Sequence, residues 1–147
     1  MRLFSFKSAQ WLNRPLDEIF AFFSDARNLQ TITPPWLKFE IKTQDPITMK
    51  QGTLIDYRLR LHGFPIAWRT KIEVWDPPFR FVDVQLRGPY RVWRHEHIFE
   101  EEAGRTHVFD HVQYAVAGGR WVQKLFVERD VARIFQFRRQ RLEEIFP

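Results

Sequence analysis

The hydrophobic pattern of the chain switches from the period of strands to that of a long helix at Gly118-Gly119. Before this point, apolar and polar residues alternate through several segments that turn residues separate, which predicts antiparallel strands. After it, from about residue 120 to 146, apolar residues recur at helical spacing and predict a helix of about 40 Å. A sheet with an apolar face must be covered, and only this helix is long enough to cover it. The predicted strands before it are 53–61, 67–75, 79–87, 90–101 and 106–115.

The N-terminal part predicts one more strand and two short helices. Residues 2–12 alternate as a strand does. Pro15 suits the first turn of a helix, where its missing N–H has no intrahelical partner. Ser24 suits the N-cap of a second helix that ends near Leu29. Two short helices are therefore expected directly after the first strand.

Proline-rich sequences mark the remaining connections. Pro34-Pro35 predicts the start of an extended segment over 36–43, and Gly63-Phe64-Pro65 predicts a turn. The whole pattern predicts one α+β domain over residues 1–147. Its curved antiparallel sheet of about seven strands is expected to wrap round the C-terminal helix.

The predicted strand 90–101 has an unusual face. Successive side chains of a strand point to opposite sides, so Trp93, His95, His97 and Phe99 share one side. Two imidazoles between two large aromatic rings suit the wall of an apolar cavity that carries polar groups. Small-molecule sites have such walls. The 15 Phe and 6 Trp of the chain also predict a largely aromatic interior.

A carboxylate is expected beside these histidines. If Ala103-Gly104 is a two-residue hairpin loop, His97 lies opposite Asp110 and His95 lies opposite Val112. The pair of His97 and Asp110 can be a satisfied polar pair, a contact to a bound ligand or a general base with its orienting acid. It can also be part of a metal site, which needs at least a third ligand. Two histidines of one strand are a weak metal signal, so neither a metal nor a cofactor is expected.

Asp83 and Gln85 lie on the preceding strand, and the length of the Gly88-Pro89 loop decides where they point. A two-residue loop pairs Asp83 with Arg94 on the outer face, as a surface ion pair of small energetic value. A three-residue loop places Asp83 and Gln85 on the face of His95. The residues alone leave both registers open.

Large rings are expected to form the apolar wall of the cavity. Tyr and Trp each carry a polar atom that needs a partner when buried, so several of them together predict a wet or ligand-filled interior. Plain core packing is the alternative for each one. The candidates are Tyr57, Trp68, Trp93, Tyr114 and Phe135.

Composition and charge exclude several other classes of protein. The chain has no Cys and therefore neither disulfides nor thiolate metal sites. It has no apolar run of about 20 residues that could span a membrane, and residues 1–10 do not resemble a signal peptide, so a cytoplasmic protein is expected. The net charge is +5. We interpret its concentration in the last helix as a solvated face rather than as a site for nucleic acid or an anionic membrane. The helix residues that make up this face are Arg129, Arg133, Arg138, Arg139 and Arg141.

Several motifs resemble the START-like superfamily, also called the SRPBCC or polyketide cyclase/dehydrase-like group, and within it a bacterial set of small stand-alone ligand-binding domains. The resemblance covers nearly the whole chain. It implies the helix-grip fold, and it tilts the open register slightly towards an inward Asp83 and Gln85. The motifs are Phe22-Phe23-Ser24-Asp25-Ala26, Ile32-Thr33-Pro34-Pro35-Trp36-Leu37, Ile55-Asp56-Tyr57, Phe81-Val82-Asp83, Gly88-Pro89-Tyr90 and the strand from Trp93 to Phe99.

Members of this superfamily bind lipids, plant hormones and polyketides, and some catalyse ring closure, so the fold alone does not select a function. We expect a small hydrophobic ligand of the lipid, polyketide or aromatic class between the sheet and the C-terminal helix. The alternative is a cyclase or dehydratase in which His97 and Asp110 act as general base and Tyr57 or Tyr114 stabilises an enolate. Trp121, Phe126 and Phe137, if exposed, would suggest a homodimer surface.

Overall fold

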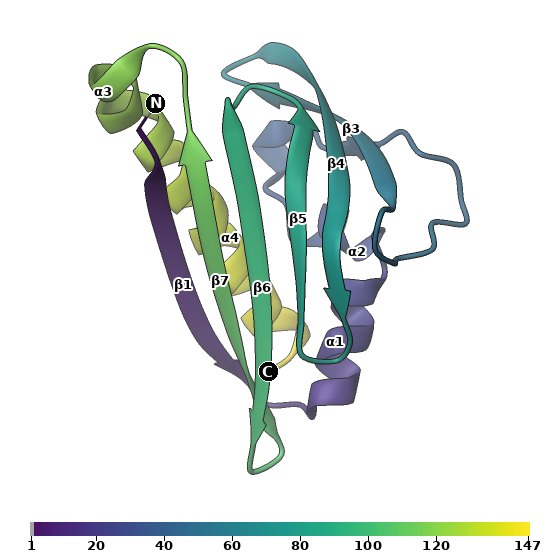
Figure 1. Cartoon of the computed structure of the whole chain (residues 1–147). Coiled ribbons are helices and arrows are strands. Elements are labelled where there is room, and N and C mark those ends of the chain that lie inside the picture. Colours follow the sequence, from purple (N-terminus) through teal and green to yellow (C-terminus); the bar gives the residue numbers. More distant parts are fainter. Residues whose placement is uncertain (1) are drawn as a thin grey trace.

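The computed structural model describes residues 2–147, in which one antiparallel sheet curves round a long helix (Figure 1). The order of the strands is β1-β7-β6-β5-β4-β3-β2, so the first and last strands in the sequence are neighbours. The seven-stranded α+β arrangement predicted from the sequence is confirmed. The strands are β1 (Phe4–Leu12), β2 (Glu40–Ile41), β3 (Leu54–Leu61), β4 (Phe64–Asp76), β5 (Arg80–Arg87), β6 (Val92–Glu102) and β7 (Arg105–Ala115).

The helices lie at both ends of the sequence. Two short helices, α1 (Leu16–Ser24) and α2 (Asn28–Thr31), follow β1 as predicted. The C-terminal segment consists of α3 (Gly119–Val122), a π-helical turn η2 (Gln123–Val127) and α4 (Glu128–Ile145). In Figure 1 the yellow-green α4 runs behind β7 and β6 and covers the concave face of the sheet. None of the helices in residues 2–147 combines the length and the apolar character needed to cross a bilayer.

The hairpin between β6 and β7 has the predicted register. Glu102 pairs with Arg105 across the loop, which places His97 opposite Asp110. Ala103 and Gly104 both have positive φ (54° and 78°), as a type I′ two-residue turn requires. This short turn fixes the register of the whole hairpin.

Three local expectations were wrong. The segment after Pro34 is not extended, because Pro35 opens a 3-10 helix η1 (Pro35–Leu37), a position where proline is tolerated. The second short helix begins at Asn28, because Asp25 Oδ1 rather than Ser24 accepts a local N–H, that of Arg27 at 2.9 Å.

The turn that was expected at Gly63-Phe64-Pro65 lies one residue earlier. His62 and Gly63 both have positive φ (50° and 84°) and form the two-residue turn. Phe64 therefore already pairs with Leu61 as the first residue of β4. All three corrections are local and leave the order of the strands unchanged.

A large aromatic cluster lies at the end of the sheet near α1. Phe20 of α1 meets Phe99 of β6 edge-on, with ring centroids 5.4 Å apart, and Phe23 lies 5.1 Å from the same ring. Leu142 of α4 is fully buried in this cluster. This aromatic base fills one end of the space between the sheet and α4.

Candidate functional site

Helix α4 buries one charged residue among its apolar contacts with the sheet. Its buried residues are Val131, Phe135, Arg138 and Leu142, which follow one helical stripe. Arg138 is only 6% exposed, so the interpretation of this arginine as part of a solvated face was wrong. The spacing of four, three and four residues makes its inward direction a consequence of the helical period.

Two cavities adjoin each other inside the fold: one lies between the sheet and α4, and the other lies between the sheet and the region of α1 and α2. The larger has a volume of about 170 Å³ and the smaller about 60 Å³. Asp83, His97 and Arg138 line both of them. The larger cavity is mostly apolar, with walls that include Tyr57, Trp68, Trp93, Tyr90 and Phe135.

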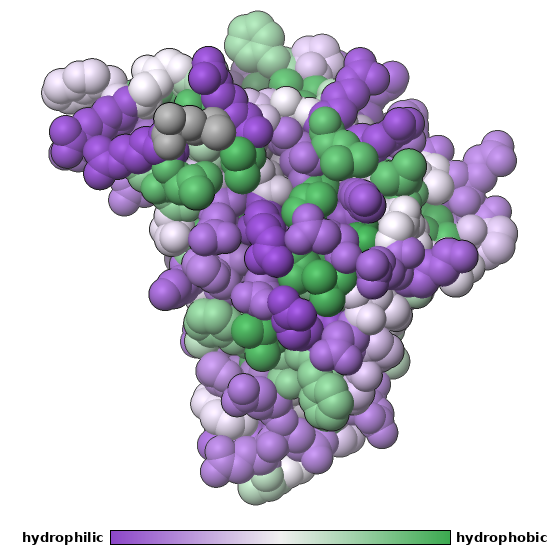
Figure 2. All heavy atoms as spheres, viewed as in Figure 1, coloured by the Kyte–Doolittle hydropathy of each residue, from purple (hydrophilic) through white to green (hydrophobic). Residues whose placement is uncertain are grey.

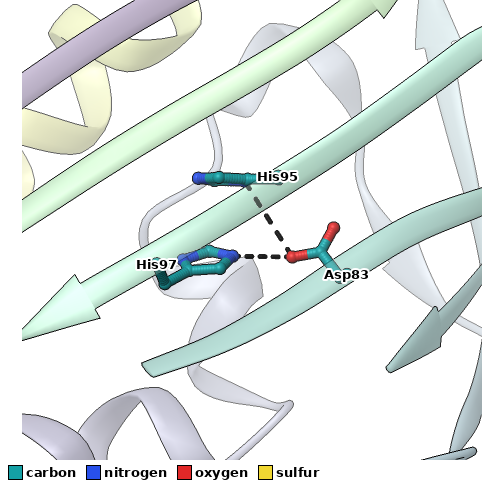
Figure 3. Close-up of side chains that lie close together, drawn as sticks. All are labelled: Asp83, His95 and His97. Carbon is teal, nitrogen blue, oxygen red and sulfur yellow. Dashed lines mark hydrogen bonds and ion pairs between the residues drawn. The ribbon is translucent and has the colours of Figure 1, made fainter. Parts of the chain in front are cut away.

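Two imidazole–carboxylate pairs join the three strands next to the cavities. His97 donates from Nε2 to Asp83 Oδ2 at 2.6 Å, and His95 donates from Nε2 to Asp110 Oδ1 at 2.7 Å. Figure 3 shows both rings directed at Asp83, to which His95 Nδ1 is 3.9 Å distant. The expected pair of His97 and Asp110 is opposite in register, yet its atoms His97 Nδ1 and Asp110 Oδ1 stay 3.5 Å apart. The diagonal lean of the side chains gives each histidine a different carboxylate.

Arg138 completes this cluster from the helix side. Its Nη2 donates to Asp110 Oδ1 at 3.0 Å, so one oxygen accepts from both Arg138 and His95. The two imidazole rings stack with centroids 3.7 Å apart, and Phe81 stacks on His97 at 4.0 Å. We call Asp83, His95, His97, Asp110 and Arg138 the buried polar cluster.

Burial and neighbouring charges shift the pKa values of three members of the cluster. Burial opposes ionisation of Asp110, but the Arg138 charge and the His95 hydrogen bond outweigh it and hold the pKa of Asp110 far below its usual range. Burial also lowers the pKa of His97 to about 4, and the neighbouring His95 adds to this effect. His97 is therefore neutral at pH 7, while the hydrogen bond from His97 and the nearby positive charges keep the pKa of Asp83 below normal despite its burial.

The hydrogen bonds of the cluster are incomplete. His97 Nδ1 and Arg138 Nε are buried and have no hydrogen-bond partner within residues 2–147. Buried polar atoms are nearly always paired, so unpaired ones mark a place where something other than stability has shaped the structure. Asp83 is the most accessible member, with its side chain 19% exposed against 5–8% for the others.

Asp83 lines both cavities, and one of its carboxylate oxygens has no hydrogen-bond or ion-pair partner within residues 2–147. All of its side-chain contacts within residues 2–147 are made by Oδ2. In Figure 3 its second oxygen points away from both imidazoles. An ionised carboxylate accepts hydrogen bonds only, so this oxygen can receive one from a hydroxyl or N–H group in the cavity.

A metal ion is the other occupant to consider. Asp83, His95 and His97 each offer one ligand atom, and these atoms lie within 4.8 Å of one another. The imidazoles stack at an interplanar angle of 27°, so their nitrogen lone pairs run side by side instead of converging on one point. Arg138 already supplies a positive charge next to Asp110. The arrangement fits a hydrogen-bonded network better than a metal centre.

Of the two registers left open for β5 and β6, the structure has the one that directs Asp83 towards the cavity face. Asp83 pairs with His95, as a three-residue loop requires. Gln85 starts on the same face but is not among the cavity-lining residues described, because its carboxamide bonds both the N–H and the C=O of Tyr90, at 3.1 and 2.7 Å. Gly88 makes this possible, since a Cβ there would lie 2.5 Å from the Gln85 oxygen.

The predicted aromatic residues separate into two groups. Tyr57, Trp68, Trp93 and Phe135 line the larger cavity. Tyr114 is not among the residues that line either cavity: it packs behind the wall, against Tyr90 and Trp93, and its hydroxyl accepts a hydrogen bond from Gln123 Nε2 at 2.9 Å. Sequence reasoning missed Arg138, which the helical stripe could have revealed, and Thr70. Thr70 lies in an alternating strand as a small polar residue among apolar ones and lines both cavities.

No family model matches the chain, and no curated protein sequence matches it either. Solved structures do. Protein CV1439 from Chromobacterium violaceum aligns over 97% of this chain and 96% of its own, with a TM-score of 0.75 at 10% identity. Major latex-like protein 151 from Panax ginseng aligns over 98% and 97%, with a TM-score of 0.72 at 9% identity.

A third structure, of Ara h 8.0201, aligns over 99% of this chain and 98% of its own, with a TM-score of 0.72 at 16% identity. The chain has an SRPBCC-like fold. Sequence identities this low establish the SRPBCC-like fold and leave the function to the site itself.

Proposed function

We propose that this SRPBCC-like protein binds a small, mostly apolar molecule that carries a hydroxyl or N–H group. The observation that carries the proposal is the free oxygen of Asp83 at the edge of an apolar cavity. Apolar walls supply most of the affinity by removing ligand surface from water. The buried polar cluster holds Asp83 ionised and fixed, so that it orients the ligand. Such a protein is expected in the cytoplasm.

The size of the cavity narrows the ligand class. A volume of about 170 Å³ is close to the roughly 150 Å³ of an engineered protein cavity that binds benzene. It is below the usual size of about 300–1,000 Å³ for drug-like ligands. Within the expected lipid, polyketide and aromatic classes, we therefore favour a compact aromatic molecule of one or two rings.

Native mass spectrometry of the freshly purified protein tests this proposal. We expect an organic mass that is released on denaturation. Ile134 of α4 lines the cavity, so Ile134→Trp should fill it and abolish retention, whereas Ala132→Trp at an exposed position of the same helix should not. A protein that carries no organic mass and binds neither indole nor p-cresol at millimolar concentration would contradict the proposal.

A second candidate is an enzyme of the cyclase or dehydratase type. Two histidine–carboxylate pairs beside a cavity support it, because such pairs act as general bases. The lowered pKa of His97, about 4, makes this residue a weak base at pH 7. Turnover of an aromatic-forming polyketide mimic that His97→Asn and Asp110→Asn both abolish would favour the enzyme, and a rate that does not change across the imidazole range of pH would oppose it.

A further inference from the structure

The segment before α4 has an inverted hydrophobic pattern. In α3 and η2 most apolar side chains face solvent: Trp121 is 75% exposed, and Leu125 and Phe126 are each 55% exposed. The buried residue of this segment is the polar Gln123. A helix that only covered a core would have the opposite arrangement. Exposed apolar patches of this kind mark interaction surfaces.

The chain holds this segment in its outward position. Gln123 anchors it by donating to the Tyr114 hydroxyl at 2.9 Å. Gly118 has a φ of +89°, and a Cβ there would lie 2.7 Å from a Val122 methyl group, so the turn into α3 requires glycine. π-helical turns such as η2 are frequent at functional sites. The exposure is therefore built into the fold.

Basic side chains surround the same corner. Arg2, Arg91 and Arg120 line a hollow of about 240 Å³ whose other lining residues are apolar or glycine. None of the three has a carboxylate partner within residues 2–147. Lys124 lies one turn from Arg120, and residues 116–127 contain no Asp or Glu. The corner thus combines exposed apolar residues with uncompensated positive charge.

We propose that this corner docks onto the surface of an anionic phospholipid bilayer. We call it the docking corner and define it by Arg120, Trp121, Lys124, Leu125 and Phe126 with Arg2 and Arg91 beside them. Trp, Leu and Phe side chains enter the interface, and the guanidinium groups bind lipid phosphates. In Figure 2, hydrophilic and hydrophobic residues lie side by side at the upper left, over the position of α3 in Figure 1.

Charge argues for a bilayer over a second copy of the chain. A symmetric dimer through this corner would bring like-charged residues of both copies together, because each copy uses the same patch. Desolvating several arginines without a carboxylate partner is costly. A bilayer with anionic headgroups offers the complementary charge and also accepts the apolar side chains.

Sedimentation with lipid vesicles tests the proposal. We expect the full chain to bind phosphatidylcholine vesicles that contain about one quarter phosphatidylglycerol, and to bind pure phosphatidylcholine at least about fivefold more weakly, the effect of a single basic residue. Raising the ionic strength from about 0.1 M to about 1 M shortens the Debye length from about 10 Å to about 3 Å and should release the protein. At equal ionic strength, inorganic phosphate should release the protein from the vesicles no more effectively than chloride does.

Variants separate the two parts of the docking corner. Trp121→Ser with Phe126→Ser should weaken vesicle binding at least tenfold, since each buried large side chain contributes roughly 1.5–3 kcal/mol. Arg91→Ala and Arg120→Ala should each weaken it about fivefold. Phe64→Ser and Arg58→Ala, at exposed positions outside the corner, are the controls and should have no effect. Thermal unfolding verifies that each variant is folded.

Three results would overturn the proposal. The first is a lack of binding to either vesicle, and the second is equal binding to neutral and anionic vesicles. The third is a concentration-dependent dimer in sedimentation velocity that Trp121→Ser dissociates, because the corner would then be an interface between copies. The test uses no cavity ligand, so its failure would leave the proposed ligand binding untouched.

Discussion

The two halves of the C-terminal helical segment depart from the usual amphipathic pattern in different ways. Helix α4 places the charged Arg138 inside, between the sheet and its own apolar neighbours. The α3–η2 half places Trp121 and Phe126 outside. In each half the residues that break the usual pattern are the ones to which we assign a function. Violations of the pattern are therefore more informative than the pattern itself.

The largest effect on stability is expected from a substitution in α4. Arg138→Met removes the cation that Asp110 needs and leaves a carboxylate without its main charge partner in the core. We expect the free energy of unfolding in urea to fall by about 3–5 kcal/mol. Arg129→Met, at an exposed position of the same helix, is the control. Combining Arg138→Met with Asp110→Asn should recover part of the lost free energy of unfolding, because no buried charge is then left unpaired. If Arg138→Met alone costs less than about 1 kcal/mol, the ion pair between Arg138 and Asp110 does not stabilise the fold.

The second prediction concerns acid stability. Between pH 6.5 and about 4 the unfolded chain binds a proton at His97 and the folded chain does not, so stability falls as the pH falls through this window. The expected loss is on the order of 3 kcal/mol. Below this window Asp83 and Asp110, whose pKa values are lowered in the folded state, add a further loss.

Urea unfolding at several pH values measures this loss. His97→Asn should flatten the slope between pH 6.5 and 4, whereas His111→Asn, on the outer face of β7, should leave it unchanged. An identical slope in His97→Asn and the natural sequence would mean that His97 does not titrate as described.

A matched pair of valines gives the smallest effect. Val131 is fully buried in α4, and Val122 is 37% exposed in α3. Val131→Ala should cost about 2 kcal/mol of unfolding free energy, because burial of each methylene contributes about 0.8 kcal/mol and a cavity remains. Val122→Ala should stay within about 0.5 kcal/mol. Equal costs for the two would contradict the inverted pattern of the outer half.

The fold was predictable because hydrophobic period and turn chemistry agree along most of the sequence. The Ala103-Gly104 turn alone fixed the partners of β6 and β7, and with them the position of Asp110 opposite His97. Turn chemistry did not decide the length of the loop at Gly88, and so it left the register of β5 and β6 open. That length depends on how Gln85 wraps over the glycine, which is a side-chain contact that spacing does not encode.

The cluster itself was only half predictable. Alternation placed His95 and His97 on the cavity face, but which carboxylate each one bonds depends on the diagonal lean of side chains between three strands. Arg138 was missed because arginine is rarely buried, although the helical period put it on the inner stripe. The π-helical turn η2 changes the helical period locally, and the single period expected over 120–146 did not predict it.

The most direct test compares p-cresol with toluene, which differ by one hydroxyl group. We would follow both titrations by the NMR signals of the methyl groups that line the cavity. A hydrogen bond to a charged group contributes about 1.5–3 kcal/mol, so p-cresol should bind at least about tenfold more tightly than toluene. Asp83→Asn keeps the shape of the side chain but removes its charge, and it should reduce that preference. Equal affinities of the natural sequence for the two molecules would contradict the role of Asp83 as the polar anchor of the cavity.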